Sequence, residues 1–377
     1  MKASSVADRS KYLILVASSG RMLAEAARKA GLKPLVIDLF ADLDTQGLAE
    51  DYRQVQSLAL EQLSPAIDYF VQRYATIDVI YGSGLEYYPE CVSYLDSRLN
   101  ILGNDFATFK RLLDKQDFFN QLERLDIHYP EVCFVKPCQD NDWLIKPLNG
   151  QGGRGITRFH HQDVDSAGGY WQKYQTGKVQ SVLFLANGER PLIIGFNSQW
   201  TAKVDHEDGF IFSGVINHTQ LTNAQKQQIQ TWLSRLVPLY HLKGLNSLDF
   251  IQDGEKSFIL EINPRPSASM AVYEDDLISA HIQACQGFLA DKWPMQTGYS
   301  GYQIVYARQE LLIPDDFEWH EGCRDLPVTQ AIIGARQPIC SIIAHQNEAL
   351  AVLRQLSNLE HTLINKLERF QTHAIHR

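Results

Sequence analysis

The stretch Phe258-Ile-Leu-Glu-Ile-Asn-Pro-Arg-Pro-Ser-Ala-Ser269 is typical of a strand that runs out into a loop. Phe258, Leu260 and Ile262 alternate on one predicted face, and Glu261 and Asn263 lie together on the other. The two prolines that follow end the strand, because proline cannot donate to a sheet ladder.

Glu261 and Asn263 place a carboxylate and an amide oxygen two residues apart at a strand end. Hard oxygen donors of this kind are the ligands that Mg²⁺ takes. Arg265 follows at once and could grip a phosphate or a carboxylate with two nitrogens. The alternative is an ordinary core strand with a polar outer face, and the rest of the chain must decide between the two.

The composition is that of an ordinary soluble globular protein, with 377 residues, 45% hydrophobic and 21% charged. This length predicts two or three domains. The net charge of −9 argues against a general nucleic-acid surface. No apolar run approaches the roughly 20 residues of a membrane helix, and the polar start is not typical of a signal peptide. Six scattered cysteines without a C-x-x-C pair favour reduced thiols and a cytoplasmic location.

The first hundred residues predict a βαβ opening and a parallel sheet. Residues 12–17 and 34–39 are short apolar runs, separated by a turn and a helical segment that Gly31 closes. Residues 77–81 and 99–103 follow as further strands. Ligands gather at the carboxyl ends of such strands, so the candidate pocket residues are Ser18, Ser19, Arg21, Asp38, Gly82 and Glu86. Ordinary turn chemistry is the alternative for each. The first turn lacks G-x-G-x-x-G, so an oxidoreductase-type dinucleotide site is weakly supported.

A lysine and a glycine-rich loop follow in the middle of the chain. Residues 142–146 form a predicted strand that ends in Lys146, and Gly150 to Gly155 spell G-x-G-x-x-G. The segment after the loop, residues 156–159, is strand-like, so the motif predicts a strand–loop–strand flap and not a dinucleotide turn. Such a flap offers backbone N–H groups to phosphates and can close as a lid. A flexible surface hairpin is the alternative.

A second hairpin decides whether a metal site can form. Residues 245–251 are a predicted strand that pairs with residues 258–263 through the turn at Asp253-Gly254. A two-residue loop would put Asp249 opposite Phe258 on the core side. A loop with three residues, or another odd number, would put Asp249 beside Glu261 and Asn263. We therefore expect an odd-numbered loop and all three oxygen donors on one face.

Two further segments complete the predicted elements. Residues 224–242 form an amphipathic helix whose core stripe consists of Ile229, Trp232, Leu233, Leu236, Val237 and Tyr240, with Gly244 expected at its C-terminal cap. Residues 106–125 are predicted to be helical and carry Lys115. Short strands near residues 304–306, 328–329, 331–333 and 339–344 precede a last helix over residues 348–370.

These pieces resemble the ATP-grasp ligases, and most closely the predicted ATP-dependent carboligases related to biotin carboxylase. The matching motifs are Asp114-Lys-Gln-Asp-Phe-Phe119, Lys146-Pro-x-x-Gly-x-Gly-Gly-x-Gly-Ile156 and Leu260-Glu-Ile-Asn-Pro-Arg265. The start resembles that group's pre-ATP-grasp domain in Ser19-Gly-Arg-Met-Leu-Ala24 and Asp38-Leu-Phe-Ala-Asp-Leu-Asp44. The tail is similar in Arg324-Asp-Leu-Pro327 and Gln337-Pro-Ile-Cys340. Some members of this group accompany the tetrahydromethanopterin or methanofuran one-carbon pathway.

The resemblance implies an α/β fold, with α+β character in the ATP-binding part. An N-terminal parallel-sheet pre-ATP-grasp domain would span residues 1–105. A lid subdomain with a linker helix would span residues 106–180. The C-terminal ATP-grasp subdomain, with the metal-site hairpin and a C-terminal extension, would span residues 181–377.

The resemblance also implies roles for individual residues. ATP would be bound by Lys115, Lys146, Gly150, Gln151, Gly152, Gly153, Arg154 and Gly155. Asp249, Glu261 and Asn263 would hold Mg²⁺ or Mn²⁺, and Lys146 and Arg265 would act in catalysis, with Arg265 on an acyl phosphate. The group usually has an acidic residue in the strand that frames adenine and ribose, whereas residues 172–177 have none. Gln172, Tyr174 and backbone groups are the expected replacements.

The implied activity is ATP-dependent ligation of a small carboxylic acid to an amine through an acyl phosphate. A carboxylase-type enzyme and a nucleotide-binding sensor or scaffold are the alternatives. The expected partners are a small carboxylate and an amine, with no nucleic acid and no membrane, and a homodimer is compatible with these expectations.

Overall fold

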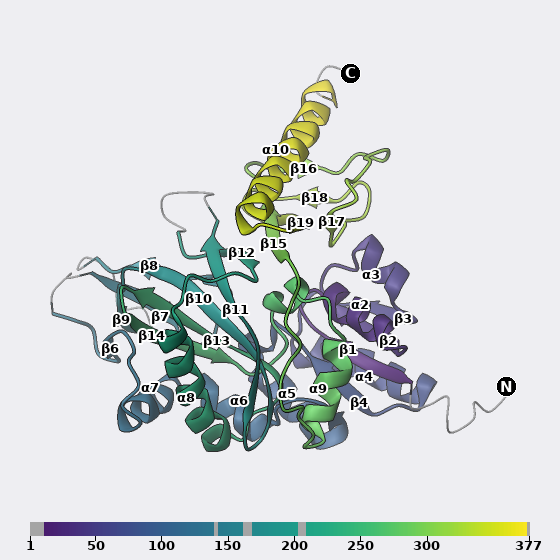
Figure 1. The fold of residues 1–377 in the computed structure, drawn as a ribbon. Helices are drawn as coiled ribbons and strands as arrows, with labels where there is room; N and C mark the ends of the chain where they lie inside the picture. The colour runs from purple at the N-terminus through teal and green to yellow at the C-terminus, as the bar shows by residue number, and fades with distance from the viewer. Residues whose placement is uncertain (1–10, 139–141, 161–167, 203–208, 375–377) are drawn as a thin grey trace.

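The structure is a computed structural model that describes residues 11–138, 142–160, 168–202 and 209–374. Figure 1 shows an N-terminal sheet with its helices beside a large antiparallel sheet, and a long C-terminal helix at the far end of that sheet. Among the described residues, no helix is both long and apolar enough to cross a bilayer.

The N-terminal sheet is parallel, with five strands in the order β3-β2-β1-β4-β5. Leu13 and Leu15 of its central strand pack into one core, whereas Ile14 and Val16 pack into another. Both faces of the sheet are therefore covered, as the βαβ prediction requires. The elements are β1 (Tyr12–Val16), α2 (Arg21–Lys29), β2 (Lys33–Asp38), α3 (Leu43–Leu48), β3 (Asp51–Gln54), α4 (Leu60–Tyr74), β4 (Asp78–Tyr81), η1 (Leu85–Tyr87), α5 (Pro89–Arg98) and β5 (Asn100–Ile101).

The lid region consists of two short helices and a four-stranded sheet in the order β6-β9-β7-β8. Its elements are α6 (Phe106–Leu113), α7 (Lys115–Arg124), β6 (Val132–Cys133), β7 (Trp143–Pro147), β8 (Thr157–Arg158) and β9 (Gly169–Lys173). The predicted helical segment of residues 106–125 is interrupted at Asp114, whose side chain accepts a hydrogen bond from the Asp117 backbone N–H at 3.0 Å. Lys115 is therefore the first residue of a separate helix.

The third region is built on an eight-stranded antiparallel sheet in the order β14-β13-β10-β11-β12-β15-β19-β17. Its strands are β10 (Lys178–Asn187), β11 (Pro191–Thr201), β12 (Phe212–Ile216), β13 (Lys243–Asp253), β14 (Lys256–Asn263), β15 (Tyr299–Tyr306), β17 (Cys323–Arg324) and β19 (Pro338–Gln346). The remaining elements are α8 (Asn223–Tyr240), η2 (Ala268–Val272), α9 (Leu277–Cys285), β16 (Leu311–Leu312), β18 (Ile332–Ile333) and α10 (Ala349–Ala374). Residues 328–329, which were predicted to be a strand, lie outside any strand. The domain limits near residues 105 and 180 stay predictions.

The hairpin of β13 and β14 differs from the prediction in its loop. Asp253 pairs with Lys256, so the loop has two residues and the expected odd number is wrong. The register then shifts between Asp249 and Phe250, and Leu260 is left without a partner in a β-bulge. This one extra residue restores the pairing of Asp249 with Glu261, which a two-residue loop alone would have prevented.

The bulge also corrects the predicted apolar face of β14. Ile259 and Ile262 are the residues buried in the main core, whereas Phe258 and Leu260 are only half-buried. The alternation of residues 258, 260 and 262 is broken because the bulge changes the phase of the strand.

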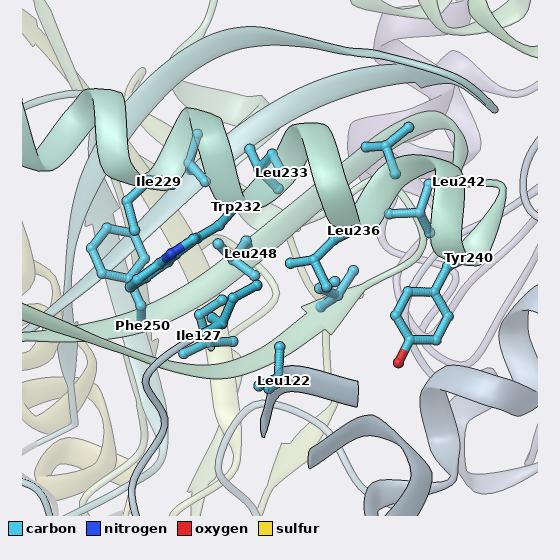
Figure 2. Packing of buried hydrophobic residues seen from close by; sticks show 14 of the residues in the cluster. Leu122, Ile127, Ile229, Trp232, Leu233, Leu236, Tyr240, Leu242, Leu248 and Phe250 are labelled. Atoms are coloured by element: carbon cyan, nitrogen blue, oxygen red, sulfur yellow. The ribbon is translucent and has the colours of Figure 1, made fainter. Parts of the chain in front are cut away.

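Helix α8 covers one face of the large sheet (Figure 2). All six residues of its predicted stripe are buried, and they pack with Leu248 and Phe250 of β13 and with Leu122 of α7. The helix ends at His241, which adopts the left-handed conformation with φ 54° and donates its backbone N–H to Val237 O. The expected cap at Gly244 is therefore wrong, and Gly244 lies inside β13.

Candidate nucleotide and metal site

The three predicted oxygen donors lie on one face of the β13–β14 hairpin. Asp249 is paired directly with Glu261, and Asn263 Nδ2 donates a hydrogen bond to Asp249 Oδ2 at 2.9 Å. Gln199 Nε2, from β11, donates to Asp249 Oδ1 at 3.3 Å. The bulge at Leu260 thus brings two carboxylates and one amide together at the end of a strand.

The two carboxylates differ in their protonation behaviour. Burial raises the pKa of Asp249 to about 7, and the neighbouring charge of Glu261 adds to this effect. Burial alone would also raise the pKa of Glu261, but the ammonium groups of Lys115 and Lys146 outweigh it and lower that pKa. The pair therefore favours a bound cation, because a cation would relieve both the burial penalty and the mutual repulsion of the two groups.

Two lysines reach this hairpin from the lid region. Lys115, at the start of α7, places Nζ 3.4 Å from Glu261 Oε2. Lys146 lies near the end of β7, where burial lowers its pKa to about 8, against the opposing charge of Glu261. The nearby positive charge of Lys115 lowers the Lys146 pKa further. Two ammonium groups that both act on Glu261 suit a polyanion such as a triphosphate.

The tip of the glycine flap makes contacts with two other parts of the chain. The Phe212 backbone N–H donates to Gly152 O at 2.9 Å, and Gln151 Nε2 donates to Ser18 Oγ at 3.4 Å. Gly153, at φ 76°, lies against Phe210 so closely that an added Cβ would be 1.8 Å from the Phe210 carbonyl oxygen. Only glycine fits at this position, and the tip of the flap contacts Ser18 after β1 on one side and Phe212 of β12 on the other.

The flap's other members are also placed by the structure. Gly152 and Gly155 have φ values of 61° and 75°, which glycine adopts readily. Arg154 lies near Tyr306 of β15, since its charge affects the pKa of that phenol. An added Cβ at Gly150 would approach the Pro147 ring at 3.2 Å. The positive φ angles of Gly152, Gly153 and Gly155 let the loop turn back between β7 and β8.

Gln172 lies in β9 and Tyr174 lies just after the end of that strand, and their surroundings differ. Gln172, in β9, is 1% exposed, and its Nε2 is a buried donor without a hydrogen-bond partner. In the pairing of β7 with β9, Gln172 lies opposite Leu144, and Lys146 is two residues after Leu144 on the same strand. Gln172 and Lys146 therefore share a face of the sheet. A buried orphan donor is costly, and a ligand acceptor beside Lys146 would satisfy it. Tyr174 is 37% exposed and contacts the Phe210 ring at the rim.

Arg265 is held more firmly than the sequence indicated. Its Nε donates to Glu86 Oε1 at 2.5 Å, and its Nη2 donates to Asn263 Oδ1 at 3.2 Å. The guanidinium is thus fixed beside the oxygen donors of the hairpin, and Glu86 contributes through this contact.

The other candidates from the N-terminal sheet do not join the site as a group. Ser19 and Arg21 both donate to Asp325 of the C-terminal region, and Asp38 accepts from the backbone N–H groups of Gly20 and Ala41. Gly82 packs against Ala17 and Leu23, which leaves it a structural residue. Of the predicted pocket residues, only Ser18 and Glu86 contact the site.

The donor set fits a divalent cation of the magnesium type. Among the described residues, no three His, Cys, Asp or Glu side chains gather as a complete metal site. Two carboxylates and an amide oxygen are donors that Mg²⁺ accepts when phosphate oxygens and water supply its remaining ligands. Gln199 was not predicted to belong to the site, because only the register of β10, β11 and β13 brings it beside Asp249.

Comparison with known proteins finds a similarity to one family in the central part of the chain. Residues 112–269 match the model of the ATP-grasp domain. An uncharacterized protein of Methanocaldococcus jannaschii is 22% identical over 270 residues, which is 66% of this chain and 64% of that protein. The arginine-specific carbamoyl phosphate synthase large chain of Bacillus subtilis is 23% identical over 194 residues, covering 46% of this chain and 18% of that protein. The chain thus spans less than two thirds of the length of both relatives.

Solved structures extend the similarity to the whole fold. Biotin carboxylase from Campylobacter jejuni matches with a TM-score of 0.71 and 14% identity, over 92% of this chain and 89% of that chain. N5-carboxyaminoimidazole synthetase from Staphylococcus aureus, solved with ADP, matches with a TM-score of 0.67 and 15% identity, over 93% and 97%. At these identities the likeness establishes the fold.

Proposed function

Since residues 112–269 carry an ATP-grasp domain, we propose that this chain is an ATP-dependent ligase that joins a small carboxylic acid to an amine. The observation that carries the proposal is that Lys115 and Lys146 both act on Glu261, which shares a face with Asp249 and Asn263. Cationic and oxygen-donor groups arranged in this way suit a nucleoside triphosphate that carries a divalent cation.

Each group has a distinct task in this proposal. Lys115 and Lys146 bind phosphate oxygens of ATP, and backbone N–H groups of residues 150–155 cover them. The buried Nε2 of Gln172 donates to an acceptor on the nucleoside, while Tyr174 lies at the edge. Asp249, Glu261 and Asn263 hold Mg²⁺ or Mn²⁺, which would neutralise charge on the phosphates when bound.

The proposed reaction has two steps. The substrate carboxylate attacks the γ-phosphorus of ATP, which gives an acyl phosphate and ADP. The amine then attacks the acyl carbon and expels phosphate, which leaves an amide. In this proposal Arg265, fixed by Glu86, stabilises the acyl phosphate, and the flap excludes water that would otherwise hydrolyse this intermediate.

A carboxylase-type reaction is the second candidate, and one comparison favours it. The biotin carboxylase domain of the Hydrogenobacter thermophilus 2-oxoglutarate carboxylase, a dimer solved with MgADP and bicarbonate, has a TM-score of 0.71 at 12% identity. In that case bicarbonate would be the carboxylate that ATP activates. A homodimer and a cytoplasmic location are part of the same proposal. A sensor or scaffold would not need both lysines beside the three oxygen donors.

The experiment is a screen for ADP release. Purified protein with ATP and Mg²⁺ is offered panels of small carboxylates, panels of amines, and bicarbonate, and the products are identified by mass. ADP release that needs both an acid and an amine supports the amide ligase, and release driven by bicarbonate supports the carboxylase. Release at the same rate from the Lys146→Ala variant would contradict both reactions.

A further inference from the structure

Glu86 is a buried carboxylate on the 3₁₀ turn η1, which follows strand β4 of the N-terminal sheet. It is 5% exposed. A charge buried to this degree is retained only where it is paired and hydrogen-bonded. Its partners therefore show what the residue is for.

The two oxygens of Glu86 have different partners. Oε2 accepts the backbone N–H of Gly84 at 2.8 Å, which fixes the carboxylate on its own turn. Oε1 accepts from Nε of Arg265 at 2.5 Å, and both side chains are 7% exposed. The ion pair thus joins the N-terminal sheet to the loop that follows β14.

From Arg265 the contacts continue into the oxygen-donor face. Nη2 of Arg265 donates to Asn263 Oδ1 at 3.2 Å, and Asn263 Nδ2 donates to Asp249 Oδ2 at 2.9 Å. An amide that accepts from a guanidinium on one side and donates to a carboxylate on the other has only one consistent orientation. Glu86 fixes the guanidinium, and the guanidinium fixes the amide.

We propose that Glu86 is a positioning residue for the cation and phosphate centre, acting through Arg265 and Asn263, which places part of the site's geometry under the control of the N-terminal sheet. This inference rests on the proposed function. Glu86 itself touches neither substrate nor cation. Without the negative charge of Glu86, Arg265 keeps only its neutral acceptors, Asn263 Oδ1 and Pro266 O, and can turn toward Asp249 or Glu261 and compete with the cation.

The same loop has other anchors, so a change at Glu86 can be separated from loss of the fold. Asn104 Nδ2 donates to Pro264 O at 2.9 Å, and the Tyr81 hydroxyl donates to Asn104 O at 2.8 Å and lies 3.4 Å from Pro264 O. These neutral contacts hold the backbone of the loop when the ion pair is removed. Tyr81→Phe is therefore the matched control, because it removes one anchor and leaves the ion pair intact.

The test measures Mn²⁺ binding by electron paramagnetic resonance, with the β,γ-imido analogue of ATP present, in wild type, Glu86→Gln and Tyr81→Phe. Partners of metal ligands are typically worth about 10–100-fold in affinity or activity. We expect Glu86→Gln to weaken Mn²⁺ binding by about tenfold or more, and Tyr81→Phe to bind as wild type. Glu86→Asp, which keeps the charge, is expected to recover part of the affinity.

A double-mutant comparison tests whether Glu86 acts through Arg265. If Glu86 acts through Arg265, Glu86→Gln has no further effect on Mn²⁺ affinity in an Arg265→Ala background. Equal affinity in wild type and Glu86→Gln, or additive losses in the double variant, would overturn the positioning role. Weakened Mn²⁺ binding in Glu86→Gln without ligation by wild type on any tested substrate would support this role and contradict the ligase.

Discussion

The docked flap gives a sharp prediction, because two neighbouring glycines differ in one respect. Gly152 and Gly153 both have positive φ values, 61° and 76°. An alanine at either position carries a left-handed cost of about 1–2 kcal/mol. A Cβ at Gly152 would meet nothing within 4 Å, whereas a Cβ at Gly153 would be 1.8 Å from the Phe210 carbonyl oxygen. The comparison of Gly153→Ala with Gly152→Ala therefore isolates the docking contact.

The magnitude follows from that contact. An ordinary approach begins near 3.4 Å, so the flap of Gly153→Ala must retreat by about 1.6 Å. This movement removes the bond from the Phe212 N–H to Gly152 O, which is 2.9 Å long and is worth about 1 kcal/mol. A loss of 1 kcal/mol corresponds to a closed flap that is about fivefold less populated.

The assay is hydrogen exchange at the Phe212 amide. We expect exchange about fivefold faster in Gly153→Ala than in Gly152→Ala, since opening exposes this one N–H. The affinity for ATP should be lower in Gly153→Ala than in Gly152→Ala. Indistinguishable exchange in the two variants would refute the docked flap.

Three other outcomes are expected. Lys146→Ala should lower the rate of ligation by about 10²-fold or more, as for other single charge-stabilising groups. Lys173→Ala, on the face of β9 opposite to Gln172, should leave that rate unchanged. ADP-release rates of the two variants test this prediction. Asp249→Asn should raise the melting temperature at pH 8, because an ionised carboxylate whose pKa burial raises to about 7 opposes folding, and it should abolish stabilisation by Mg²⁺ with ATP. A lower melting temperature would contradict this. His281 accepts the Leu245 N–H on Nδ1. Burial lowers the pKa of His281 from 6.5 to about 4. The unfolded chain therefore binds more protons between these pH values, and the free energy of unfolding should rise by about 3 kcal/mol as pH increases from 4 to 6.5. Denaturant titrations at several pH values should show that the free energy of unfolding of His281→Gln depends less on pH.

Local sequence patterns predicted much of the fold. The βαβ opening, the stripe of α8 and the strand–loop–strand flap follow from periodicity and glycine placement, and the structure contains all three. The break at Asp114 was also visible in principle, since aspartate is a preferred N-cap residue.

The bulge at Leu260 shows where sequence reasoning ended. No glycine or proline marks it, and the apolar alternation of residues 258–262 predicts an unbroken strand. The shared face of Asp249 and Glu261 was expected from an odd loop, but it arises from an even loop combined with the bulge. The register depends on the packing of Ile259 and Ile262 against α8 and α7, which lie outside the hairpin.

The contacts between regions were likewise beyond local reasoning. Glu86 was expected in a pocket at a strand end, and it instead pairs with Arg265, 179 positions along the chain. Arg21 was expected beside a ligand and is bound to Asp325. Charge and position along a strand indicated that these side chains were unusual, but only the arrangement of the sheets selects their partners.

The most direct test of the central claim is a crystal structure with the β,γ-imido analogue of ATP and Mn²⁺, with the cation located by its anomalous signal. The account predicts a Mn²⁺ peak among the oxygen atoms of Asp249, Glu261 and Asn263, with the triphosphate between Lys115 and Lys146 beneath the flap. A peak remote from the β13–β14 hairpin, or a nucleotide bound outside the lid, would contradict it.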